Sequence, residues 1–110
     1  MDRAKELIKV KGMQVAPAEL EAALLTHSEI ADCAVVPILS ERSGELPKAF
    51  VVRTDTDEGK ALTQDQVIHF VDGIVADYKR IAEVEFIDEI PKSAAGKILR
   101  RVLRDRAQGE

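Results

Sequence analysis

The chain has 110 residues, of which 45% are hydrophobic and 33% are charged, and its formal net charge is −4. This length and composition fit one soluble globular domain, residues 1–110, with a modest core. The negative charge argues against a general nucleic-acid binder and against an anionic-membrane binder, because both need a positive field. The sequence has no apolar run long enough to cross a membrane and no apolar signal-peptide core at its start. One cysteine, Cys33, cannot form an internal disulfide, which favours the reducing cytoplasm.

The first pattern is an alternation of apolar and polar residues over 6–15, on either side of Gly12. It predicts two short strands joined by a tight bend, at which glycine allows a positive φ. Lys9 and Lys11 should then project from the face opposite Val10. Such lysines form the wet side of a strand in many proteins, and the alternation alone leaves that interpretation open.

Apolar runs bounded by turn residues predict the next elements. They are a helix from Pro17 to about 27–28, a central strand from Ile30 to about Pro37, a polar loop over 40–45 and a strand over 47–52. The short loop between the two strands favours their antiparallel pairing.

The second half of the chain begins with an acidic, glycine-containing segment, 54–60, that reads as a loop. Thr63 and Gln66 have the spacing of a capping box and predict the start of a helix. Lys79 and Arg80 should end that helix. Helical spacing predicts its core face to be Val67, Phe70, Val71, Ile74, Val75 and Tyr78. Alternation over 84–87 predicts a last strand.

The C-terminal stretch 91–101 runs from a loop of small residues into a basic amphipathic segment that begins at Lys97. A long ammonium side chain on such a loop can reach a phosphate or carboxylate bound elsewhere. The expected apolar stripe is Ile98, Leu99, Val102 and Leu103, and the expected opposite side is Arg100, Arg101 and Arg104. The stretch is not a phosphate-binding P-loop, because Pro91 replaces its first glycine and Ile98 replaces its Ser or Thr.

The predicted order β-β-α-β-β-α-β-α indicates an α+β fold. We expect a small two-layer sandwich: a short N-terminal hairpin plus a mostly antiparallel three-stranded sheet, covered on one side by helices. His27 and His69 have no cysteine or carboxylate at a ligand spacing, so the sequence predicts no metal site.

Residues 2–21 and 91–101 together resemble the C-terminal domain of the acyl-adenylate-forming (AMP-binding) superfamily, over essentially the whole chain. That group includes acyl-CoA synthetases, peptide-synthetase adenylation domains and firefly luciferase, and the first motif looks most like the 4-coumarate–CoA ligase and fatty-acyl-CoA ligase branch. The motifs of the large N-terminal domain are absent from the sequence. The resemblance therefore implies an excised, mobile lid domain behind an added Met1, with little activity alone.

The resemblance implies an ATP-dependent acid–thiol ligase whose substrates are a carboxylic acid, ATP with Mg²⁺ and CoA, with no metal or cofactor resident in this domain. It assigns Lys97 to stabilisation of charge during adenylation, and Arg3, Lys9 and Gln14 to nucleotide and substrate binding. Lys5 corresponds to a hinge about which the domain would rotate against its partner, the N-terminal AMP-binding domain.

After that rotation, Lys11 and Gly12 would line the tunnel for CoA. A lysine acetyltransferase acting on Lys97 would erase its charge and stop adenylation. Two alternatives stay open. The acceptor could be a carrier protein instead of CoA, or the domain could be a non-catalytic module that docks through Arg100, Arg101 and Arg104.

Overall fold

The structure is a computed structural model that describes residues 7–41, 44–75 and 79–109. Arg3 and Lys5, the expected nucleotide-binding and hinge residues, lie outside this part of the chain, as does Tyr78. The elements are β1 (Ile8–Val10), β2 (Met13–Val15), α1 (Pro17–Leu24), β3 (Ile30–Ser40), β4 (Gly44–Arg53), α2 (Asp57–Ala61), α3 (Gln64–Asp72), β5 (Glu83–Phe86) and α4 (Arg100–Gly109).

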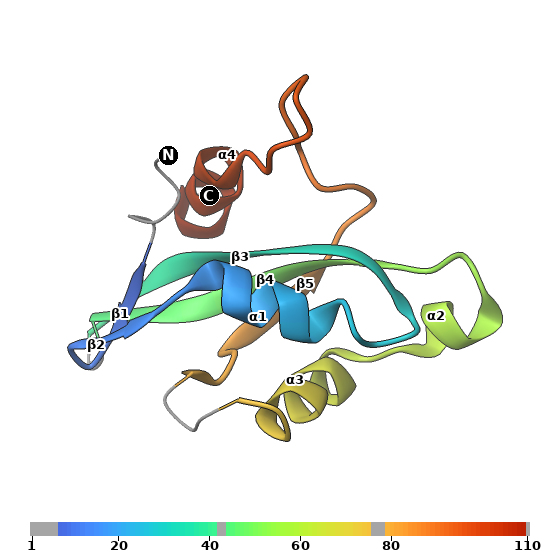
Figure 1. The fold of residues 1–110 in the computed structure, drawn as a ribbon, viewed down its shortest axis with the longest axis horizontal. Helices are drawn as coiled ribbons and strands as arrows, with labels where there is room; N and C mark the ends of the chain where they lie inside the picture. Colours follow the sequence, from blue (N-terminus) through green and yellow to red (C-terminus); the bar gives the residue numbers. More distant parts are fainter. Residues whose placement is uncertain (1–6, 42–43, 76–78, 110) are drawn as a thin grey trace.

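The strands form one mixed sheet, in which β4 is central (Figure 1). β4 pairs antiparallel with β3 on one side, and on its other side with β1 (antiparallel) and β5 (parallel). The α+β class and the mostly antiparallel sheet are thus confirmed. The predicted hairpin is not separate from the sheet: Val10 pairs with Gly44, and the Lys9 N–H donates to a Glu45 carboxylate oxygen at 2.9 Å. The sheet therefore has five strands instead of three.

Hydrophobic cores lie on both faces of this sheet, because successive residues of β3 point to opposite sides. Cys33 and Val35 belong to the core that α1 and α3 cover. Ala34 and Val36 belong to a second core, with Phe50, under α4 and the segment that leads to it. Figure 1 shows α4 and α3 on opposite sides of the sheet. The expectation of helices on one side alone was wrong, because the C-terminal segment folds back over the second face.

The long strand β3 was predicted to be central, but it lies at the edge of the sheet. It also passes through Pro37, where the sequence predicted its end. The N–H groups of Cys33 and Val35 point away from β4 and donate to side-chain acceptors. Every second residue of a strand directs its backbone nitrogen to the same side, and Pro37 is the next residue in this series. The nitrogen of Pro37 therefore lies on the free edge of the sheet, where a missing N–H costs no ladder hydrogen bond.

In the segment predicted as an acidic loop, α2 forms because the Thr56 hydroxyl accepts the Gly59 N–H at 2.9 Å and caps the helix.

The capping box of α3 is present as predicted, with both hydrogen bonds between Thr63 and Gln66. The helix nevertheless ends at Asp72, well before Lys79, and Gly73 is its C-terminal cap. Glycine disfavours helix by about 1 kcal/mol relative to alanine. Ile74, predicted to be in the core, is consequently 52% exposed.

The C-terminal helix α4 buries only part of the predicted apolar stripe. Leu103 is fully buried in the second core, and Ile98 and Ala107 pack partly against it. Leu99 and Val102 are exposed. The reason is that the helix begins at Arg100, so positions 103 and 107, four residues apart, form its buried line.

A second contact holds the far end of α4 on the sheet. The Arg106 guanidinium donates to Glu85 of β5 at 2.8 Å, and the buried Lys48 ammonium donates to the other oxygen of the same carboxylate at 2.9 Å. The hydrogen bond from Lys48 is the main cause that lowers the pKa of Glu85 below its ordinary value. The two cations thus stabilise the ionised form of this carboxylate.

We expect Leu103→Ala to lower the free energy of unfolding by about 2–5 kcal/mol, because it leaves a cavity in the second core. Leu99→Ala is the matched control, since it removes the same atoms from an exposed position on the same segment. It should cost less than half as much. Urea denaturation of both variants measures the difference, and equal losses would contradict the packing of α4 described above.

Candidate functional site

Lys97 lies near the end of a closed loop, residues 92–98, that precedes α4. The loop is closed by an antiparallel bridge between Lys92 and Ile98, which consists of a hydrogen bond from the Ser93 N–H to the Lys97 carbonyl at 2.8 Å and one from the Leu99 N–H to the Pro91 carbonyl at 2.9 Å. Within it, the Gly96 N–H donates to the Ser93 carbonyl at 2.9 Å, and Gly96 has a φ of +86°, which favours glycine. The backbone of Lys97 is thus held in place while its side chain is exposed.

Both arms of this loop end in an ion pair with a carboxylate on the body of the domain. On the N-terminal arm, the Lys92 ammonium donates to Asp32 of β3 at 2.6 Å. On the C-terminal arm, which leads into α4, the guanidinium of Arg100, the first residue of that helix, donates to the two oxygens of Glu21 of α1 at 2.6 Å and 3.3 Å. Arg100 is therefore turned inward. The sequence had predicted it on the solvated side of the segment, and that prediction was wrong.

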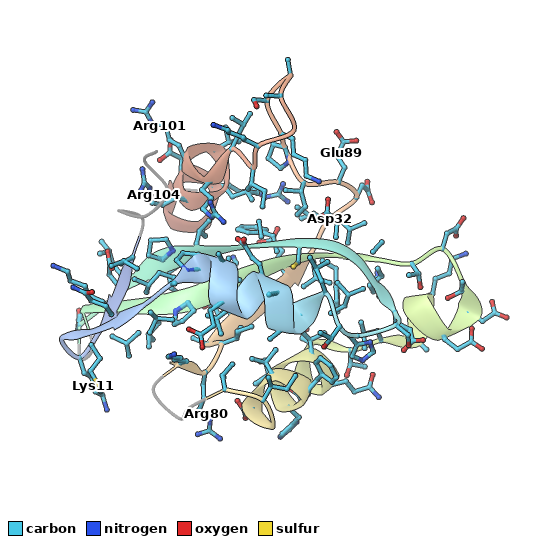
Figure 2. All side chains as sticks on the ribbon, in the orientation of Figure 1. Lys11, Asp32, Arg80, Glu89, Arg101 and Arg104 are labelled. Atoms are coloured by element: carbon cyan, nitrogen blue, oxygen red, sulfur yellow. The ribbon has the colours of Figure 1, made fainter. Side chains whose placement is uncertain are left out.

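The same two carboxylates also accept N–H groups from the free edge of β3. Asp32 accepts the N–H of Cys33 and Glu21 accepts that of Val35, each at 2.9 Å. Figure 2 shows Asp32 on β3, on the side of the sheet that faces the loop. Each carboxylate therefore joins one arm of the Lys97 loop to one outward-pointing N–H of the edge strand. We call Glu21, Asp32, Lys92 and Arg100 the loop clamp.

The other candidate residues lie on the β1–β2 hairpin. Lys9 and Gln14 are direct cross-strand partners, and both are exposed. Lys11 does not extend the strand as predicted, because it lies in the turn with a φ of +52°. Gly12 follows it with a φ of +84°, and a Cβ built there would meet no atom within 4 Å. The backbone at the tip of the hairpin is therefore open to solvent.

The structure does not bring the hairpin and the Lys97 loop together. Lys11 marks the tip of the hairpin at one end of the sheet, whereas the loop rises on the α4 side of the molecule (Figures 1 and 2). Arg101 and Arg104 lie on the outer side of α4 (Figure 2). One domain thus presents two separate polar surfaces, one around Lys97 and one around Gly12.

Within the described ranges, the structure holds no cluster of His, Cys, Asp and Glu able to bind a metal ion. In the same part of the chain, no helix has the length and hydrophobicity needed to span a bilayer. Cys33 lies beside the clamp but is buried, and this burial, with a smaller effect of Glu21 and Asp32, raises the pKa of its thiol to about 12. The protonated thiol is a poor nucleophile at neutral pH.

Three residues of the loop clamp, Glu21, Asp32 and Lys92, were not predicted from the sequence. Glu21 lies 79 residues from Arg100, and Asp32 lies 60 residues from Lys92, so no local spacing relates them. One signal was available: Glu21 is four residues after Pro17 and next to Leu20, which places a carboxylate on the buried side of α1.

Because the Cys33 thiol is buried and protonated, we expect the folded chain to react with a disulfide reagent such as DTNB at least about 100-fold more slowly than the chain in 8 M urea. The absorbance of the released thiolate measures both rates. Equal rates in the two conditions would show that the edge of β3 opens freely. That result would contradict an edge held by the loop clamp.

Comparison with known proteins relates these features to one family. Residues 19–97 match the family model described as the AMP-binding enzyme C-terminal domain. A 4-coumarate–CoA ligase 1 of Petroselinum crispum is 58% identical over 106 residues, which are 96% of this chain and 19% of that protein. A 4-coumarate–CoA ligase 1 of Solanum tuberosum is 55% identical, with the same coverage.

Solved structures agree with the sequence relatives. Apo MatB from Rhodopseudomonas palustris superposes with a TM-score of 0.89 at 31% identity, over 97% of this chain and 21% of that one. A fatty acyl CoA synthetase of Mycobacterium tuberculosis gives a TM-score of 0.85 at 31% identity, over 96% and 20% of the two chains. The chain spans about a fifth of the length of these relatives. It belongs to the AMP-binding enzyme C-terminal domain family.

Proposed function

We propose that this domain works as the mobile C-terminal domain of an ATP-dependent acid–thiol ligase that makes an acyl-CoA through an acyl-adenylate. The proposal is supported by relatives named as CoA ligases and by the two separate polar surfaces of the domain. A large AMP-binding domain of the same enzyme would be its partner. That domain would hold the carboxylic acid and the Mg²⁺ that accompanies ATP.

In the first step, a carboxylate oxygen attacks the α-phosphorus of ATP, and the bond from that phosphorus to the pyrophosphate oxygen breaks. Negative charge accumulates on the oxygens around the phosphorus in the transition state. The Lys97 ammonium would stabilise that charge more strongly than it stabilises the bound substrates, which is what lowers the barrier. The observation that carries this assignment is an exposed lysine on a closed, anchored loop.

In the second step, the thiol of CoA attacks the acyl carbonyl, its proton is lost, and AMP leaves. The hairpin surface would then face the partner domain. Gly12 and Lys11 would line the tunnel for the thin thiol arm. Lys9 and Gln14, on the strands of the same hairpin, would approach the nucleotide and the carboxylate during the first step. The open space around Gly12 supports this use of the turn.

Because the Lys97 loop and the Gly12 turn lie on different parts of one domain, a single docked orientation would not present both to the same active site. We infer a rotation between the two steps, with Lys5 as the hinge and Arg3 near the ribose of the nucleotide. Rigid-body closure about a few residues is an established way to separate two catalytic states.

Two alternatives make different predictions. If the acceptor is a carrier protein, free CoA will not take the acyl group from the adenylate. If the domain is a non-catalytic docking module, its arginines should matter and Lys97 should not. The ion pair of Arg100 with Glu21 disfavours this second alternative, because it removes one of three arginines from the docking surface.

Acetylation of Lys97 is a further proposal for control of the same step. The lysine is exposed, so a lysine acetyltransferase could reach it, and acetylation would remove its positive charge. The ligase acetylated at Lys97 should then lose adenylation to the same extent as a variant that lacks the lysine.

We predict that Lys97→Ala, in this domain joined to its AMP-binding domain, lowers carboxylate-dependent exchange of pyrophosphate into ATP by about 100-fold or more, because a preorganised charge is lost from the transition state. Thioester formation from supplied acyl-adenylate and CoA should survive. Unchanged exchange would contradict the role of Lys97, and loss of both reactions to the same extent would contradict the division between two surfaces.

The reciprocal control is Gly12→Asn, since asparagine tolerates a positive φ but adds a side chain at the open turn. It should slow thioester formation and leave pyrophosphate exchange intact. Lys60→Ala, an exposed lysine on α2, should change neither reaction.

A further inference from the structure

We propose that Asp32 and Lys92 are positioning residues for adenylation: their ion pair fixes the loop that carries Lys97. This inference deepens the proposed function and rests on it. The pair joins β3 to the N-terminal arm of the loop with an ammonium–carboxylate distance of 2.6 Å, short for such a bond. Neither residue belongs to the reacting surface assigned above.

The antiparallel bridge at the base of the loop and the Ser93 side chain transmit the position of Lys92 to Lys97. Lys92 is bridged to Ile98, the residue after Lys97. Ser93, the residue after Lys92, donates its N–H to the Lys97 carbonyl at 2.8 Å, and its hydroxyl accepts the Lys97 N–H at 3.3 Å. A displacement of Lys92 would therefore move the backbone from which the Lys97 side chain extends.

Asp32 is itself held in place, which makes it a suitable anchor. One of its oxygens binds Lys92, and the other accepts the N–H of Cys33, so the carboxylate bridges the loop and the sheet edge. The other arm of the loop is held in the same manner by Glu21 and Arg100. Without the Asp32 pair, the N-terminal arm would keep the buried side chain of Ile90 and the hydrogen bond from the Leu99 N–H to the Pro91 carbonyl, but it would lose the ion pair that ties it to β3.

If the pair had a purely structural role, breaking it would lower the stability of the fold. The exposure of the pair to solvent argues against such a role. The Lys92 side chain is 39% exposed and that of Asp32 is 32% exposed, and ion pairs this open to solvent contribute little to folding. Catalysis depends more strongly on the position of Lys97, since displacing a catalytic group by about 1 Å can slow a reaction about 100-fold. The pair should therefore affect the rate of adenylation more than the melting temperature.

The test compares Lys92→Met, Asp32→Asn and the double variant in the full ligase. Met keeps the stem of the lysine, and Asn keeps an oxygen for the Cys33 N–H. We expect each single variant to lower kcat for pyrophosphate exchange by about tenfold, with the KM for ATP within about twofold, because transition-state positioning is lost and ground-state binding is kept. The double variant should lose no more than either single one, because both changes break the same interaction.

Three further measurements separate positioning from other roles. Lys92→Arg restores a cation at the same place and should recover most of kcat. Thioester formation from acyl-adenylate should be unchanged in every variant. Lys60→Met, which breaks the exposed pair between Lys60 of α2 and Asp55, is the matched control and should have no effect.

Independent, multiplicative losses from the two single variants would overturn the inference. So would a loss with Lys92→Met but not with Asp32→Asn, which would mean that Lys92 contacts the substrate directly. Lys97→Ala is run in the same assay. If it abolishes exchange while the Asp32 and Lys92 variants retain full activity, this inference fails and the proposed function stands. If Lys97→Ala retains exchange, both fail.

Discussion

The arrangement of this domain depends on the carboxylate of Glu21. It lies in the interior, where an unpaired charge costs several kcal/mol, and its oxygens are satisfied by the Val35 N–H and the Arg100 guanidinium. These partners come from an edge strand and from the first residue of the last helix. The charge is therefore satisfied only when α1, β3 and α4 are assembled in this one way.

The position of the C-terminal segment follows from this contact. With Arg100 held, α4 lies across the second face of the sheet, where Leu103 fills the core and Arg106 reaches Glu85. The loop before the helix must then leave the sheet next to Asp32, which binds its other arm through Lys92. Lys97 is thus carried on a loop whose two ends are fixed to one edge strand, while the hairpin keeps a separate surface at the other end.

Local patterns predicted what depends on neighbours in the chain. The β1–β2 hairpin with its turn at Gly12, the capping box at Thr63 and the exposed loop lysine Lys97 each follow from spacing over a few residues. Contacts between distant segments were not accessible in this way. The inward turn of Arg100 depends on Glu21, which is 79 residues away, so the basic segment looked uniformly solvated. The same limit hid the fold-back of α4 and with it the second core.

The most direct test of this account is hydrogen exchange at the loop amides of the isolated chain, measured by NMR. Glu21→Gln keeps the shape of the side chain and an acceptor for Val35, but it removes the charge that holds Arg100. The account predicts that the Ser93 and Gly96 amides then exchange about tenfold faster, as local opening becomes easier, while amides in the centre of β4 are unchanged. Glu58→Gln on the exposed α2 is the control. If the loop amides exchange at the wild-type rate in Glu21→Gln, the loop does not depend on the buried carboxylate and the account is wrong.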